Sequence, residues 1–167
     1  MQSNQIKLID KMFEYNLWAN TQLIELCSGL VDEQLEVEIE GGFGRIHPTL
    51  VHLIRAEGGY LNRLTGTRPW TDEDDLEWDR LSMGDLLAKA QLSGEQLIAV
   101  AGKVNPETRH DIELQGKPYH FFDWTVVLQA LYHGIEHRTQ IKILLTQLGV
   151  EHPELAAWDY MSSLSSA

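Results

Sequence analysis

The longest periodic stretch of the chain, residues 123–149, most restricts the folds that it can adopt. It runs DWTVVLQALYHGIEHRTQIKILLTQLG, and its apolar residues recur at steps of three and four. This spacing predicts one long amphipathic helix, which Asp123 opens and Gly149 ends. Such a helix needs other helices against which to bury its apolar stripe.

Three further stretches have the same periodicity. They extend from about residue 5 to 28, from Pro48 to about Gly66, and from Ser82 to just before Asn105. Four long helices with polar connections, and no strand pattern of substance, predict an all-α four-helix bundle. With 167 residues, the chain is expected to form a single domain over 1–167.

The connections between the predicted helices carry weaker signals. Residues 35–40 alternate briefly, which predicts a short strand or an extended loop. Residues 67–82 are interpreted as an acidic, solvated loop whose two tryptophans pack against the body. Residues 109–122 alternate around Gln115 and Gly116, which predicts a short hairpin or an ordered loop before the last helix. The stretch after Gly149 is expected to be a tail with fraying serines, from which Trp158 and Tyr160 pack back.

The charge of the chain limits its partners. Its 13 Lys and Arg residues against 25 Asp and Glu residues give a formal net charge of −12. A chain with this negative charge repels nucleic acids and anionic membrane surfaces, so neither is expected as a partner. The N-terminal residues show no basic stretch followed by a long apolar run, and no run of about 18 apolar residues occurs, so neither a secretion signal nor a membrane span is expected. Cys27 cannot form an internal disulfide and is predicted to be a core residue, which suits a cytoplasmic protein.

Two histidines stand four residues apart in the longest predicted helix. At that spacing His133 and His137 lie about 40° and 6 Å from each other, so both imidazoles can reach one ion. Projection places several apolar residues on the same side, namely Ala130, Ile141, Leu144 and Leu148. Both rings are therefore predicted to point into the bundle. Without partners each ring would cost about 1–3 kcal/mol there, and a divalent metal removes that cost. The plain alternative is a pair of hydrogen-bonded core histidines.

A third ligand is available from the second predicted helix. His52 lies at the edge of its apolar stripe, and neighbouring helices in a bundle lie about 8–10 Å apart. Three neutral histidines with an open position are typical of a catalytic metal site rather than a closed structural one. Imidazole suits Zn, Ni, Cu and Fe alike. The remaining histidines are expected at a helix start or in exposed segments: His47, His110, His120 and His152.

Several other side chains are candidates for supporting roles. Arg138 follows the second histidine of the pair, and Arg63 lies on the His52 side of its helix, so either could receive a carboxylate of a substrate. The alternative for both is a solvated or paired surface arginine. Glu57 projects well round the helix from His52, which disfavours it as a group that orients that ligand. Three aromatic residues could either form the walls of a cavity or belong to the core: Trp18, Tyr60 and Trp124.

Four blocks of sequence resemble a known family. They are YNLWAN (15–20), HPTLVHLIRAEGGYLNRLTG (47–66), FFDWTVVLQALYHGIEHRTQI (121–141) and LGVEHPELAAWDY (148–160), and the chain is similar to the DinB/YfiT family of metal-dependent proteins over about 6–160. The resemblance implies an up-down-down-up order of helices and a divalent ion, commonly zinc or nickel. It also implies that the ligands are His52, His133 and His137, and that dimers are frequent.

Three functions are compatible with these observations. In the family, some members are thiol-dependent transferases or isomerases, which implies a metalloenzyme that joins a small thiol to a small electrophile. A metal-bound water would instead make the chain a hydrolase. A third hypothesis, from another class, is a non-catalytic metal-binding protein that dimerises in a stress response. The HExxH pattern is absent, which argues against the zinc peptidase mechanism.

Overall fold

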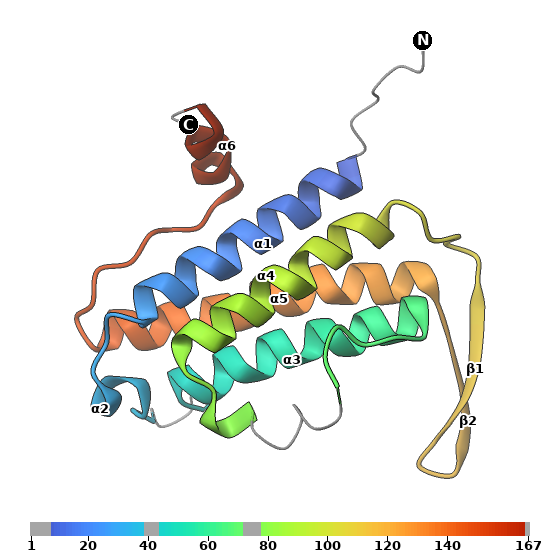
Figure 1. The fold of residues 1–167 in the computed structure, drawn as a ribbon, viewed down its shortest axis with the longest axis horizontal. Coiled ribbons are helices and arrows are strands. Elements are labelled where there is room, and N and C mark those ends of the chain that lie inside the picture. Colours follow the sequence, from blue (N-terminus) through green and yellow to red (C-terminus); the bar gives the residue numbers. More distant parts are fainter. Residues whose placement is uncertain (1–7, 39–43, 72–77, 166–167) are drawn as a thin grey trace.

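The structure is a computed structural model, and it describes residues 8–38, 44–71 and 78–165. These residues are mostly helical and include one small two-stranded sheet (Figure 1). The long helices are α1 (Leu8–Cys27), α3 (Ile46–Thr65), α4 (Met83–Ala101) and α5 (Asp123–Gln147). The short ones are α2 (Asp32–Leu35), η2 (Trp78–Arg80) and α6 (Ala157–Ser165). In the described part of the chain, every helix is too short or too polar to cross a membrane.

The four long helices pack in a ring. Helices α1 and α3 each contact both α4 and α5. In Figure 1, α1 and α5 run in one direction, whereas α3 and α4 run in the other. The centre of the ring is filled by fully buried side chains, among them Ile24, Leu50, Leu86 and Ile141. Burying one such side chain contributes about 1.5–3 kcal/mol, so the packed apolar stripes hold the helices at fixed positions.

The helix boundaries follow the predicted signals closely. Pro48 lies in the first turn of α3, which ends where Gly66 adopts a left-handed φ of 76°. The Ser82 hydroxyl caps α4 by accepting a hydrogen bond from the backbone N–H of Asp85. Helix α4 ends at Ala101, earlier than the expected boundary before Asn105. The first three residues of the first predicted helix, 5–7, lie outside the described residues.

Two connections differ from expectation or match it only in part. The extended segment predicted over 35–40 is wrong at its start, because Leu35 ends helix α2 and is buried against the core; residues 39–40 lie outside the described residues. In the acidic segment, Trp70 and Trp78 are buried as predicted, with ring centroids 4.9 Å apart. Trp70 fits because Gly58 has no side chain: a Cβ there would lie 2.1 Å from the Trp70 ring.

The predicted hairpin is confirmed. Strand β1 (Arg109–Leu114) pairs with β2 (Lys117–Phe122) in antiparallel register, so that Ile112 lies opposite Tyr119. Gln115 and Gly116 form the turn with φ of 53° and 75°, the positive values that two-residue hairpin turns require. The hairpin extends along one end of the bundle and leads directly into α5 (Figure 1).

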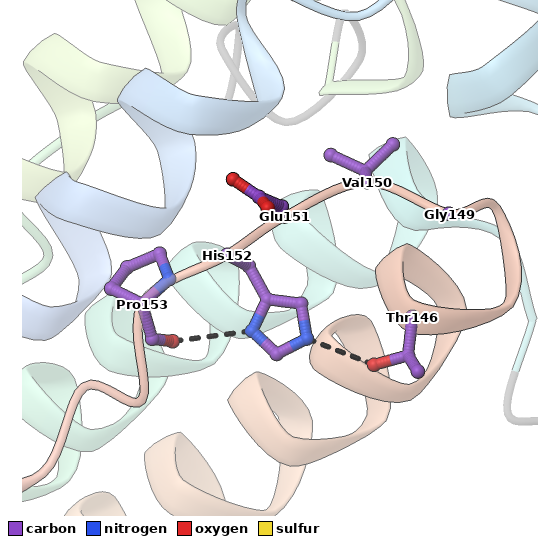
Figure 2. A pocket seen from close by; sticks show the side chains of 6 residues that line it. All are labelled: Thr146, Gly149, Val150, Glu151, His152 and Pro153. Atoms are coloured by element: carbon purple, nitrogen blue, oxygen red, sulfur yellow. Dashed lines mark hydrogen bonds between the residues drawn. The ribbon is translucent and has the colours of Figure 1, made fainter.

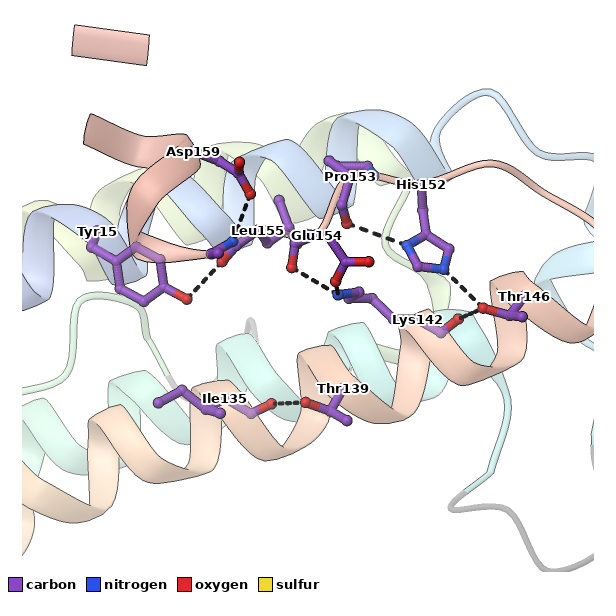
Figure 3. A network of polar contacts seen from close by, with 11 residues as sticks. Tyr15, Ile135, Thr139, Lys142, Thr146, His152, Pro153, Glu154, Leu155 and Asp159 are labelled. Atoms are coloured by element: carbon purple, nitrogen blue, oxygen red, sulfur yellow. Dashed lines mark hydrogen bonds and ion pairs between the residues drawn. The ribbon is translucent and has the colours of Figure 1, made fainter. Parts of the chain in front are cut away.

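After α5 the chain turns back and runs over the helices. His152 stands in a shallow pocket at this turn, and its Nε2 lies 2.9 Å from the Thr146 hydroxyl (Figure 2). Further along, the Lys142 ammonium donates to the backbone carbonyl of Glu154, and the Tyr15 hydroxyl donates to that of Leu155 (Figure 3). These bonds fix the returning segment against α5 and α1.

The prediction of a C-terminal tail holds as far as Ala156, but the residues that follow form the helix α6. The Asp159 carboxylate accepts a hydrogen bond from the backbone N–H of Ala156 and so starts the helix. Tyr160 packs back as predicted, with its ring centroid 5.5 Å from that of Trp18. The same prediction is wrong for Trp158, because 75% of its surface is exposed.

Candidate metal centre

Three histidine side chains converge where α3 meets α5. The Nε2 atom of His133 lies 3.1 Å from Nε2 of His52 and 3.0 Å from Nε2 of His137. One ring nitrogen of each residue lies within 4.8 Å of the other two. The convergence has two causes. The four-residue spacing stacks His133 and His137 on α5, and the packing of α3 against α5 brings His52 beside them.

The three histidines differ in their exposure to solvent. His52 is exposed, whereas His133 and His137 are at least partly buried, and their rings face His52 of α3, in line with the predicted orientation toward the neighbouring helices. The residues projected onto the same side, Ala130, Ile141 and Leu144, are in the core.

Gln140 orients one of the rings. Its side-chain oxygen lies 2.6 Å from Nδ1 of His137. A carbonyl oxygen only accepts, so Nδ1 carries the proton and donates it to Gln140. Nε2 then presents its lone pair to the other two rings, as a metal ligand requires. Sequence reasoning missed Gln140, although its position three residues after His137 on the same helix face was a usable signal.

The environment keeps the imidazoles of His133 and His52 neutral. Burial lowers the pKa of His133 to about 4, and the nearby His137 and His52 lower it further in the same direction. Burial also lowers the pKa of His52, helped by His137 and Arg55. Both rings are therefore uncharged at pH 7 and have lone pairs available for a metal.

The geometry fits a divalent ion. Zinc binds imidazole nitrogen at about 2.0–2.1 Å, which places tetrahedral ligand atoms about 3.3 Å from one another. The two shorter separations, 3.0 and 3.1 Å, are close to that value. Among the described residues, the group contains histidines alone and has no carboxylate or cysteine. A divalent ion held by these three neutral ligands would keep its charge uncompensated and would have at least one position open for another ligand.

Arg138 and Glu57 belong to a different group, in the centre of the bundle. The Glu57 carboxylate accepts hydrogen bonds from the amides of Asn16 and Asn20, each at 2.9 Å, and from the Ser93 hydroxyl at 2.5 Å. Arg138 donates to the two asparagine oxygens at 2.8 and 2.6 Å. We call these five residues the core polar cluster. Arg138 is 3% exposed, so it is neither a surface residue nor in reach of a substrate.

A pocket of about 340 Å³ lies beside the histidines, between α3, α5 and the hairpin. Tyr60 and Arg63 of α3 line it, as does Gln129 of α5. The Tyr60 ring also packs edge-on against His133, with centroids 5.8 Å apart. Of the three aromatic candidates, Tyr60 alone is among the residues that line this pocket.

The other four histidines take no part in the group formed by His52, His133 and His137. His47 lies in the first turn of α3, at a helix start as expected; it is partly buried, and its Nε2 lies 2.9 Å from the Leu81 carbonyl oxygen. His110 was expected to be exposed, but it is partly buried, bonded to Asp123 and stacked on Phe121. His120 is exposed, as expected.

The family model described as the DinB family matches residues 1–164, nearly the whole chain. No curated protein matches it.

Proposed function

The chain belongs to the DinB family, and from its histidine group we propose that it is a metal-dependent transferase that joins a small thiol to a small electrophile. The observation that carries the proposal is the convergence of His52, His133 and His137, whose ring nitrogens lie within 4.8 Å of one another. Three histidine ligands and an open position are typical of a catalytic metal site. In this proposal the ion is divalent, zinc or nickel.

Each residue has a stated task in the reaction. His52, His133 and His137 hold the ion through Nε2, and Gln140 keeps His137 in the tautomer that permits it. When bound, the ion supplies the positive charge that keeps the sulfur of a thiol deprotonated at neutral pH. The thiol proton is released to solvent, and sulfur then forms a bond to the electrophilic carbon. A leaving group departs from that carbon with the electron pair of its bond.

The charge of the site supports an anionic fourth ligand. Three neutral imidazoles leave two positive charges on a divalent ion, whereas a carboxylate or thiolate from the protein would cancel part of them. A thiolate meets that requirement, and the DinB resemblance favours it. A metal-bound water also meets it, and so the hydrolase alternative belongs in the same experiment.

The test compares turnover with and without the metal. Protein loaded with zinc or nickel is mixed with cysteine or glutathione and 1-chloro-2,4-dinitrobenzene, and the aryl thioether is followed by absorbance. Loaded wild type and the control variant His120→Ala should exceed the uncatalysed rate, whereas metal-free protein and His133→Ala should not. Metal-dependent ester hydrolysis without a thiol would favour the hydrolase instead. If the protein unfolds when the metal is removed, and the metal-loaded protein shows no turnover, the hypothesis of a non-catalytic metal-binding protein is favoured.

We also propose that the chain acts as a cytoplasmic homodimer built on the up-down-down-up four-helix bundle. The ring of contacts between the long helices supports that bundle. An exposed apolar stripe on α5 supports the dimer, because Trp124, Leu128, Tyr132 and Ile135 are each about half exposed on one helix face. Light scattering after gel filtration should give twice the chain mass, 38 kDa from the 19.0 kDa of one chain. Leu128→Glu should reduce it to the monomer mass.

A further inference from the structure

We propose that the pocket beside the histidines binds the electrophile, and that it selects molecules with a ring-sized apolar body and one carboxylate, which Arg63 receives. The identity of this ligand as the substrate rests on the proposed function. The binding preference itself rests on the pocket alone. Its volume of about 340 Å³ lies within the range of small-molecule sites.

The pocket adjoins the proposed metal position. Gln129 stands four residues before His133 on α5, which is a rise of about 6 Å along the helix. Tyr60 forms part of the pocket wall and also packs against His133. A ligand in the pocket therefore has one end near the histidine group, where an attacking sulfur would be held.

One face of the hairpin supplies an apolar wall. Side chains alternate along a strand, so Ile112 and Leu114 of β1 share a face with Tyr119 and Phe121 of β2, and all four line the pocket. Three of them remain largely open to solvent, with exposures of 42% for Ile112, 52% for Leu114 and 50% for Tyr119. The core therefore does not account for these apolar side chains, whereas an apolar ligand lying against them does.

Arg63 supplies the charge. It is the one charged side chain among the residues that line the pocket, and no acidic residue lies among them. Its Nη1 donates to the Gly59 carbonyl at 3.0 Å, which uses one of the five guanidinium donors and fixes the group against its own helix. A guanidinium pairs with a carboxylate through two parallel hydrogen bonds. In a chain of net charge −12, a local cation without acidic neighbours in the pocket favours an anionic ligand.

The test measures binding to metal-free protein, so that no turnover is needed. The probes are 3-phenylpropionate and its neutral amide, 3-phenylpropanamide, titrated by calorimetry at low salt. Wild type should bind the acid at least about tenfold more tightly than the amide, a difference of about 1.4 kcal/mol. Arg63→Gln should bind both probes equally. The matched control is Arg109→Gln, which removes the same charge from the opposite hairpin face and should keep the preference for the acid.

A second variant tests the apolar wall. Tyr119→Ser should weaken the binding of the acid and of the amide by the same factor, because it removes the contact with the Tyr119 ring and leaves Arg63 in place. The inference is overturned if neither probe binds, if wild type binds both equally, or if Arg63→Gln keeps the preference. It is also overturned if the acid binds only after zinc is added and this binding is lost in His133→Ala, because the carboxylate then lies on the ion. Loss of thiol turnover with the binding pattern intact would contradict the proposed function alone.

Discussion

The core polar cluster and the histidine group are both sets of polar side chains between packed helices, but they differ in how their hydrogen-bonding groups are satisfied. In the core, the Glu57 carboxylate and the Arg138 guanidinium are bridged by two asparagines, Asn16 and Asn20. At the rim, His52, His133 and His137 turn their Nε2 atoms toward one another. Polar groups that are paired within the core stabilise the fold, whereas three imidazoles gathered at a solvent-accessible edge are suited to hold a cation.

On α5 the two groups are formed by neighbouring residues. His137 and Arg138 are adjacent on α5, and their side chains point about 100° apart, so one reaches the rim and the other the core. The core polar cluster joins α1, α3, α4 and α5, and Nη2 of Arg138 is its one buried side-chain atom without a partner among the described residues. We therefore expect changes in the core to alter stability, and changes at the rim to alter metal binding.

The largest expected effect is on metal affinity in His133→Ala. Structural zinc sites bind with about 10–16 kcal/mol, so one ligand of three is expected to supply about 4 kcal/mol, which is about a thousandfold in Kd. Competition with a chromophoric chelator measures it, with His120→Ala as the control. The metal-free variant should unfold within about 0.5 kcal/mol of wild type. Unchanged zinc affinity would exclude His133 as a ligand.

Arg138→Met should instead lower the stability of the fold and have little effect on zinc affinity. It leaves the Glu57 carboxylate buried without its cationic counterpart, and we expect the free energy of unfolding to fall by about 3 kcal/mol. Urea denaturation measures the change. Adding Glu57→Gln should restore part of the loss, because the remaining side chain is neutral. A fall in the free energy of unfolding of less than about 1 kcal/mol would contradict the structural role of the core polar cluster. A loss of zinc affinity as large as that in His133→Ala would contradict its separation from the metal site.

Gln140→Leu should lower metal affinity by about 10–100-fold, the usual range for residues that orient a ligand. The reason is that Nδ1 of His137 loses its acceptor, so the ring is no longer held in the required tautomer. Chelator competition measures this as well. Gln129→Leu is a matched control on the same helix and should keep its zinc affinity. Equal affinities for both variants would remove Gln140 from the site.

The smallest expected effect concerns Cys27. Burial raises the pKa of its thiol to about 12, and the side chain is fully enclosed. The thiol therefore stays protonated from pH 7 to 10 in the folded protein, whereas in the unfolded chain it ionises near its usual value of about 8.5. Ellman's reagent at pH 8 should detect no thiol in the native protein and one per chain in denaturant. A fast native reaction would mean that the core is open to small electrophiles.

The sequence predicted the long helices and the hairpin because their signals are local. Periodicity, the Ser82 cap and the Gln115-Gly116 turn each act within a few residues. The same local rule placed the histidine pair on one face of α5. It could not fix the depth of each histidine in the α3–α5 contact, because that depends on which neighbour covers each side of the helix, so the partial exposure of His137 did not follow from the sequence.

The position of Arg138 shows most clearly what local sequence patterns cannot predict. Its partners Asn16 and Asn20 lie 122 and 118 residues away, so no nearby pattern indicates that a charged residue is satisfied in the core. The helix α6 was missed for another reason, since its serine-rich sequence has weak helix propensity and its Asp159 cap is a single residue.

X-ray absorption by the zinc-loaded protein tests the central claim most directly, because it reports the atoms that surround the ion. We predict three imidazole nitrogens at about 2.0–2.1 Å and, after a thiol is added, one new sulfur at about 2.3 Å. Fewer than three imidazoles would contradict the assignment of His52, His133 and His137 as the ligands. Three imidazoles without a sulfur at saturating thiol would contradict the transferase and leave the metal site standing.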